Sequence, residues 1–395
     1  MSLISRLRQA SFSLRRFSTV LSPDSSKTLS AKEKTRAALN LIKFEKNPSR
    51  IVEICKAASL TPEAPLDRIT LSVAITKLSG SNHFEIIREF LDDLKSRPDL
   101  KTERFISHAM VLYGQAKMID QAIQTFKQCN ELGVVPSVRI LNSLIFACIL
   151  AKDYKEVSRV FVEFPKVYGI VPNLDTYNRV IQAFSESGST SSAYSILAEM
   201  DRKGVKPDAT TFGCLLSGFY SEERFEEVGK VLTLMEKYGL RLGVSTYNIR
   251  IHSLCKLKKV DEAKALLDGM VSRGIKPNSV TYSHLIHGFC KAGKLVEAKS
   301  LFREMTFKGC QPDSNCYFTL VYFMCQGKDF DNALEISKES IAKKWVPNFT
   351  TMKSLVDGLV SVSKVAEAKE LISQIKENVR VKVDLWDEIE AGLPQ

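Results

Sequence analysis

The sequence of 395 residues has no long apolar run: no stretch approaches 18 uninterrupted apolar residues, about the length that a membrane-spanning helix requires. We therefore expect no membrane span. The sequence also lacks any C-x-x-C pair, although it contains nine cysteines. Because thiols at metal-ligand spacing are missing, we interpret the cysteines as small buried hydrophobic residues in a reducing compartment, and not as disulfides or a zinc site.

Histidine is scarce, with five residues in the whole chain. His284 and His287 are one helical turn apart, a spacing that permits metal binding, but no cysteine or carboxylate set accompanies them. We predict no metal, no cofactor and no small-molecule substrate.

Acidic residues are absent from the first 23 positions, which hold four arginines and six serines. An amphipathic N-terminus of this composition is typical of an organelle transit peptide. The piece Arg15–Thr19 also resembles plant mitochondrial processing sites. We predict that residues 1–30 are a mitochondrial transit peptide and a disordered linker, so that the protein works in the mitochondrial matrix. A basic tail without a targeting role is the alternative.

Hydrophobic residues make up 44% of the chain, which is enough to bury a core, and the net charge is +11. A basic balance of this size favours a polyanionic partner such as nucleic acid. Part of the positive charge lies in the amino-terminal segment, so the excess on the folded part is smaller.

Residues 244–278 and 279–313 are two copies of one pattern, identical at 14 of 35 positions. A fixed period of this size indicates a stacked repeat array. The residues that recur 35 apart include Thr246 and Thr281, Tyr247 and Tyr282, His252 and His287, Cys255 and Cys290, Lys256 and Lys291, Ala263 and Ala298, Met270 and Met305, Gly274 and Gly309, and Pro277 and Pro312.

Eight such units are predicted over residues 103–383. They begin at Glu103, Val138, Leu174, Ala209, Val244, Ser279, Ser314 and Phe349, and all have 35 residues except 138–173, which has one more. Apolar residues at helical spacing fill two segments of each unit, so each unit is predicted to be a helical hairpin. Residues 31–102 are predicted to form degenerate helical repeats that cap the array, and residues 384–395 a carboxy-terminal cap or tail.

Several recurring residues are predicted to serve packing and turns. A small residue in the second helix lets the two helices of a hairpin approach, a methionine fills gaps between units, and a glycine ends the second helix with a left-handed cap. These sets are Ala122, Ala193, Ala263, Ala298, Ala333 and Ala368; Met200, Met235, Met270 and Met305; and Gly133, Gly204, Gly239, Gly274 and Gly309.

A 35-residue hairpin that reads TYN, then CK, EA, M and G, and ends in P(D/N) resembles the pentatricopeptide repeat of the pure 35-residue class. The resemblance covers residues 103–383. It implies an all-α fold, a right-handed α-solenoid (superhelix) of stacked helix-turn-helix repeats, whose first helices line a groove for single-stranded RNA. In that family each repeat can read one base with its fifth and last residues.

Carried over by position, the resemblance gives four plausible reader pairs. They are Asn142 with Asn173, Asn178 with Asp208, Asn248 with Asn278, and Ser283 with Asp313. Capping of helix starts is the alternative role of such residues, and the two roles are compatible. The fifth residues Gly213, Phe318 and Lys353 have no sensible reading by the family's code.

Two departures from the family pattern argue against a high-affinity, sequence-reading surface. Family members usually sandwich bases between aliphatic second residues, and here only Val280 fits, the others being Arg139, Asp175, Thr210, Ser245, Asn315 and Thr350. Phosphate-contacting lysines near the end of the first helix are also few, with only Lys256 and Lys291 in place. Lost stacking removes on the order of 1–3 kcal/mol per base.

We predict a non-catalytic protein, because only residues 384–395 follow the array and no nuclease or deaminase domain fits there. The segments VSTYNIRI, KALLDGM and TYSHLIHGFC also resemble small pentatricopeptide constituents of the small subunit of the plant mitochondrial ribosome. We therefore predict a structural role in that subunit, with ribosomal RNA and mitochondrial ribosomal proteins as partners. A factor that binds one mitochondrial mRNA and a protein-binding helical scaffold are the alternatives.

Overall fold

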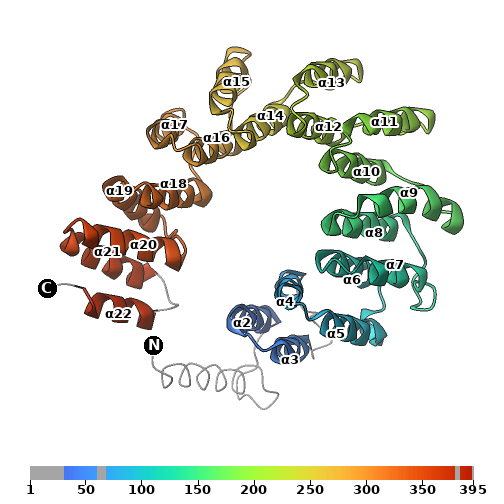
Figure 1. Ribbon diagram of the computed structural model, residues 1–395, viewed down its shortest axis with the longest axis horizontal. Coiled ribbons are helices and arrows are strands. Elements are labelled where there is room, and N and C mark those ends of the chain that lie inside the picture. The colour runs from blue at the N-terminus through green and yellow to red at the C-terminus, as the bar shows by residue number, and fades with distance from the viewer. Residues whose placement is uncertain (1–30, 60–67, 379–382, 394–395) are drawn as a thin grey trace. The chain divides into compact units, whose positions relative to one another are not determined.

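The computed structural model describes residues 31–59, 68–378 and 383–393. Over these ranges the chain forms α-helices and two short 3-10 helices, without a β-strand (Figure 1). The all-α class predicted from the sequence is therefore confirmed. The predicted transit segment, residues 1–30, lies outside the described residues. The helices gather into two compact units, Met1–Pro207 and Asp208–Gln395.

The first unit contains five successive helical pairs. Their elements are α2 (Ala31–Phe44), α3 (Pro48–Ser59), α4 (Arg68–Gly80), α5 (Phe84–Ser96), η1 (Pro98–Leu100), α6 (Glu103–Gln115), α7 (Ile119–Lys127), α8 (Val138–Ala151), α9 (Tyr154–Tyr168), α10 (Leu174–Glu186), η2 (Thr190–Ser192) and α11 (Ala193–Arg202).

The second unit continues the same alternation and ends in a short helix. Its elements are α12 (Ala209–Ser221), α13 (Phe225–Lys237), α14 (Val244–Lys256), α15 (Val260–Ser272), α16 (Ser279–Lys291), α17 (Leu295–Phe307), α18 (Ser314–Gln326), α19 (Phe330–Ala342), α20 (Phe349–Ser361), α21 (Val365–Asn378) and α22 (Val383–Ala391). None of the helices described here is long and apolar enough to cross a bilayer.

The even-numbered helices from α6 to α20 open the repeats and are called first helices below; their odd-numbered partners are second helices. The first helices begin at the residues where the sequence placed the repeat starts. In the second unit, α14 packs against α12 and α16, and α18 against α16 and α20, so the first helices form one layer and the second helices another (Figure 1). The division of the whole chain into cap, array and tail stays a prediction.

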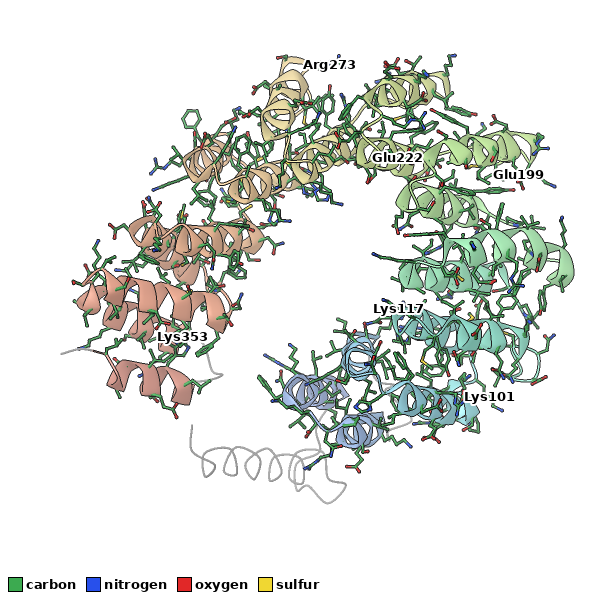
Figure 2. All side chains as sticks on the ribbon, viewed as in Figure 1. Lys101, Lys117, Glu199, Glu222, Arg273 and Lys353 are labelled. Atoms are coloured by element: carbon green, nitrogen blue, oxygen red, sulfur yellow. The ribbon has the colours of Figure 1, made fainter. Side chains whose placement is uncertain are left out.

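A buried tyrosine joins the two helices of a hairpin. The side chains of Tyr177, Tyr282 and Tyr317 are almost wholly buried. The hydroxyl of Tyr177 donates a hydrogen bond to Glu199, labelled in Figure 2, at 3.3 Å, and the hydroxyl of Tyr282 bonds Glu304 at the same distance. Burial, reinforced by the carboxylate, raises the pKa of both hydroxyls. Tyr177 and Tyr282 therefore hold their hairpins together and are not available to a ligand.

The packing and turn residues singled out in the sequence have the predicted roles. The six alanines are fully buried, and the four methionines are at most 1% exposed. The five glycines all have positive φ, between 69° and 75°, which only glycine adopts without steric cost. Seven of the nine cysteines are buried, and all are free thiols. Cys214 and Cys310 are half-buried, so the interpretation as core residues holds for most but not all of the set.

The one 36-residue repeat takes its extra residue in its second helix. Helix α9 has 15 residues, whereas α13, α15, α17 and α19 have 13 each. The turn that closes first helix α8 is in its usual place, with Lys152 in the left-handed region at φ 62°. The insertion therefore leaves the first-helix layer unchanged.

The carboxy-terminal helix α22 closes the second unit. Trp386 is 2% exposed and packs edge to face on Phe349 of α20, with ring centroids 5.0 Å apart. Lys376 of α21 pairs with Asp387 at 2.5 Å and with Glu390 at 2.9 Å. Asp387 and Glu390 of this helix thus pair with a lysine of the preceding helix.

Candidate nucleic-acid interface

One face of each first helix carries the second, sixth, ninth and thirteenth residues of its repeat, because steps of four, three and four residues follow one helical stripe. We call this face the first-helix stripe. On α16 it consists of Val280, His284, His287 and Lys291. Val280 is 45% exposed, and His287 and Lys291 are also exposed. The predicted site residue Val280 and both predicted lysine positions therefore lie on the same accessible surface.

The last residue of a repeat is the N-cap of the next first helix. Its side-chain oxygen accepts a hydrogen bond from the backbone N–H three residues later in Ser137, Asn173, Asp208, Asn278, Asp313 and Asn348. At Asn173, Asp208 and Asn278 a threonine hydroxyl also accepts from the N-cap backbone N–H, which completes a capping box. The alternative reading of these residues as helix caps is thus confirmed.

Asn142, the fifth residue of its repeat, is 5% exposed and bonded to the next repeat. Its amide nitrogen donates to Asn173 Oδ1 at 3.2 Å and to Asp175 Oδ2 at 2.9 Å. Its amide oxygen accepts from the hydroxyl of Thr176 at 2.6 Å. Since an amide has two N–H donors, both donors of Asn142 are used within the protein.

Asn248 makes the equivalent bonds with one difference. Its amide nitrogen donates to Asn278 Oδ1 at 3.3 Å, and its oxygen accepts from the hydroxyl of Thr281 at 2.6 Å. The second residue here is Val280, which has no acceptor to offer in place of the Asp175 carboxylate. One N–H of Asn248 is therefore left for a partner outside the repeat pair.

The other two predicted pairs are placed differently. Asn178 is 9% exposed on α10 in the first unit, and Asp208 caps α12 in the second unit. Ser283 is half-buried on α16, while Asp313 caps α18 by accepting from the backbone N–H of Cys316 at 2.9 Å. Within each of the two Asn–Asn pairs, the fifth residue of the repeat is thus hydrogen-bonded to the last residue of the same repeat.

The two predicted phosphate-contacting lysines are exposed at the ends of α14 and α16. Among the side chains that the structure describes, neither Lys256 nor Lys291 lies within 4.0 Å of a carboxylate, whereas neighbours such as Lys264 and Lys294 are paired, the latter with Asp261 at 2.7 Å. Their charge is therefore available to a polyanion.

A pocket of about 760 Å³ lies against α4, α6, α8 and α10 in the first unit. Arg68, Arg139 and Arg179 line it together with the ring of Phe146. The guanidinium of Arg179 lies over that ring, 4.9 Å from its centroid, and pairs with Asp175 at 3.1 Å. Part of the positive charge and the aromatic face of this pocket are thus occupied by the protein itself.

The arginine pocket was not foreseen from the sequence, although Arg139 and Asp175 were noted as second residues. The sequence feature that could have indicated it is the recurrence of arginine on the first-helix stripe, at Arg104, Arg139 and Arg179. His108 also lines the pocket. Burial, with Arg68 and Arg104 nearby, lowers the pKa of His108 to about 4, so this imidazole is neutral near pH 7. Within the described residues, no three His, Cys, Asp or Glu side chains are placed to hold a metal ion.

Family models of the pentatricopeptide repeat match several parts of this chain. The PPR repeat family matches residues 172–221, 242–291 and 279–326. The pentatricopeptide repeat domain matches residues 124–187, and the PPR repeat matches residues 210–240.

Similar proteins of known name carry the same repeats. A mitochondrial pentatricopeptide repeat-containing protein of Arabidopsis thaliana is 54% identical over 402 residues, which cover 100% of this chain and 99% of the relative. The Arabidopsis small ribosomal subunit protein mS78 is 30% identical over 211 residues, 52% of this chain and 53% of its own length. The crystal structure of PPR10 from maize aligns with 91% of this chain and 55% of its own at 18% identity and a TM-score of 0.40.

The relative that spans the whole chain is named as mitochondrial, in agreement with the location expected from the amino-terminal segment. The repeat models agree with the period of 35 residues and with the helical hairpins of the structure. From the repeat matches and from 54% identity along its full length, we conclude that this chain belongs to the pentatricopeptide repeat family.

Proposed function

We propose that this protein is a non-catalytic RNA-binding repeat protein that serves as a structural component of the small subunit of the mitochondrial ribosome and so supports translation. The observation that carries the proposal is that the side-chain amides expected to read bases are already hydrogen-bonded within the protein. Asn142 and Asn248 are buried and hydrogen-bonded to Asn173 and Asn278. A surface whose base-reading groups serve the fold suits contacts by shape and charge with structured RNA better than it suits the reading of a base sequence.

Names of relatives support the same role. Two Arabidopsis proteins that are 30% and 29% identical to this chain over about half its length or less are named as small ribosomal subunit proteins mS78 and mS79. The relative that spans the whole chain is named only for its repeats and its location. The ribosomal role therefore rests on partial relatives together with the chemistry of the interface.

A second candidate is a factor that binds one mitochondrial transcript and protects or remodels it. The remaining N–H of Asn248 and the unpaired Lys256 and Lys291 favour it, because all three lie in the two repeats that keep most of the family pattern. The third candidate, a protein-binding helical scaffold, has no observation in its particular favour.

Sedimentation of a mitochondrial lysate separates these candidates. The ribosomal role predicts that the protein migrates with the small subunit and stays there in moderate salt. A free pool enriched on a single mRNA would exclude that role and support the transcript factor. Comigration that survives ribonuclease but not removal of other proteins would support the scaffold.

RNA contact itself is tested with Asn248→Ala combined with Lys256→Ala. We expect weaker binding of single-stranded RNA and a shallower dependence of log Kd on log salt, because one phosphate contact is lost, about 0.7 in slope for a single strand. Lys237→Ala on second helix α13 removes the same charge from the other layer and serves as the control. Unchanged binding at every salt concentration would reject this surface.

A further inference from the structure

Three neighbouring first helices of the second unit carry two groups of contacting rings. His252 of α14 stacks on His284 of α16, with ring centroids 4.3 Å apart and planes tilted by 40°. On the same face of α16, His287 meets Phe323 of α18 edge to face, with ring centroids 6.0 Å apart. Phe323 in turn contacts Tyr322 at 5.1 Å. We call these five residues the ring strip.

Two rings of the strip are exposed, the other three are half-buried, and the strip lies beside Lys256 and Lys291. His252, His287 and Tyr322 are the ninth residues of their repeats, and they stand on the first-helix stripe between the second and thirteenth positions. Tyr322 is 47% exposed, and His287 is also exposed. Lys256 and Lys291 follow one helical turn after His252 and His287 on the same stripe.

The three histidines are neutral near pH 7. Burial is the first cause, followed by nearby histidines and lysines, and together they lower the pKa of His252 to about 4 and lower those of His284 and His287 as well. The rings are therefore flat, uncharged π surfaces next to fixed positive charges. Proteins that bind single strands without sequence preference combine these two features, because every base has a π face and every linkage a phosphate.

The aliphatic second residues that family members use to sandwich bases are missing on two of these helices, where Ser245 and Asn315 stand. On the other first helices that the structure describes, the rings of the stripe are His108 of α6 and Phe146 of α8, and both line the arginine pocket. In the first unit, the ring of Phe146 is covered by Arg179. On α20 the ninth residue is Asp357, which pairs at 2.5 Å with Lys353, the residue labelled in Figure 2. The second unit thus concentrates its rings where its aliphatic residues are lacking.

We propose that the ring strip is a stacking surface for bases of single-stranded RNA, that Lys256 and Lys291 contact the neighbouring phosphates, and that this surface holds bases without regard to their identity. The inference rests on the proposed RNA-binding function and adds its mode of contact. In this mode of contact, bases are held by the sixth, ninth and tenth residues of the repeat instead of the second, fifth and last.

The test is the affinity of the full chain for labelled oligouridylate, oligoadenylate and an abasic ribose-phosphate oligomer of equal length. The double variant His287→Leu with Tyr322→Leu keeps large side chains at both positions but removes two aromatic rings. We expect about tenfold weaker binding or more for both base-bearing oligomers, because one stacked base contributes about 1–3 kcal/mol and 1.4 kcal/mol is about tenfold. Binding of the abasic oligomer and the salt slope should not change.

Two further variants serve as controls. Tyr322→Phe keeps the ring and should bind like the wild type. Val296→Ala with Phe307→Ala removes apolar groups that are 82% and 91% exposed on second helix α17, and should also bind like the wild type. Thermal melting shows whether each variant is folded.

The outcomes separate the inference from the function on which it rests. Equal affinity of the leucine variant and the wild type, or an equal loss on the abasic oligomer, would overturn the stacking surface while RNA binding stands. A loss for only one base would overturn the claim that base identity does not matter. A wild-type protein that binds no RNA at all would overturn both this inference and the proposed RNA-binding function.

Discussion

An asparagine side chain at the fifth position of a repeat carries only two N–H donors and one carbonyl oxygen. At Asn142 one donor goes to Asn173, the last residue of the same repeat, while the second donor and one lone pair of the oxygen bond Asp175 and Thr176 of the next repeat. At Asn248 the second residue is Val280, so one donor is left. The identity of the second residue of the next repeat thus decides how many N–H donors of the amide are used within the protein.

Asn142→Ala is therefore expected to act on stability and not on RNA. The substitution removes the three hydrogen bonds of the amide, although Asp175 keeps Arg179 and the Thr176 hydroxyl keeps Asn173 as a partner, so the free energy of unfolding should fall by about 1–3 kcal/mol. Urea unfolding measures this change. Undiminished stability with weaker RNA binding would instead make Asn142 a base contact.

His108 gives the protein a predicted loss of stability in mild acid. Its pKa is about 6.5 in the unfolded chain and is lowered to about 4 in the folded state by burial, with Arg68 and Arg104 adding to the effect. The folded state therefore disfavours the proton, and the stability contributed by the neutral ring is complete above about pH 6.5 and is lost as the pH falls towards 4.

The corresponding experiment compares wild type with His108→Gln at pH 7 and pH 5. Because the half-buried ring is partly screened by solvent, we expect the variant to lose on the order of 1–2 kcal/mol less than the wild type between the two pH values. Parallel losses in the two proteins would show that His108 does not carry this pH dependence.

At the scale of helices, the spacing between α14 and α16 depends on a glycine. A Cβ built at Gly288 would lie 2.5 Å from Cys255 Sγ and 2.7 Å from Cys255 Cβ. The two first helices therefore approach more closely than any side chain at position 288 would permit. This approach is also what brings the rings of His252 and His284 to 4.3 Å.

Gly288→Ala should lower the free energy of unfolding by about 1–3 kcal/mol, since the helices must separate or Cys255 must leave its rotamer. Gly269→Ala is the matched control on second helix α15, where an added Cβ meets nothing within 4 Å. There alanine should stabilise the helix by about 0.5–1 kcal/mol. Chemical unfolding of both variants measures the sign of the change in the free energy of unfolding. An increase for Gly288→Ala would contradict the close packing of α14 and α16.

At the scale of the whole chain, the repeat period predicted most of the architecture. The helical class, the hairpins and the residues where first helices begin follow from apolar spacing that recurs every 35 residues. The hydrogen bonds of Asn142 and Asn248 could not be predicted, because they join side chains 30 or more residues apart whose geometry depends on how closely neighbouring helices stack. The arginine pocket and the ring strip could not be predicted either, because each is formed by side chains of several helices, and the sequence does not show which faces of these helices meet.

The extra residue of the second repeat shows where a repeat can accept an insertion. Helix α9 accommodates it while α8 ends at its usual turn and Asn173 still caps α10. A lengthened second helix thus alters only the layer away from the first-helix stripe. Insertions and deletions of this kind can accumulate on the second-helix side, through neutral drift or for the benefit of a new protein neighbour, while the pitch at which consecutive nucleotides would be met is preserved.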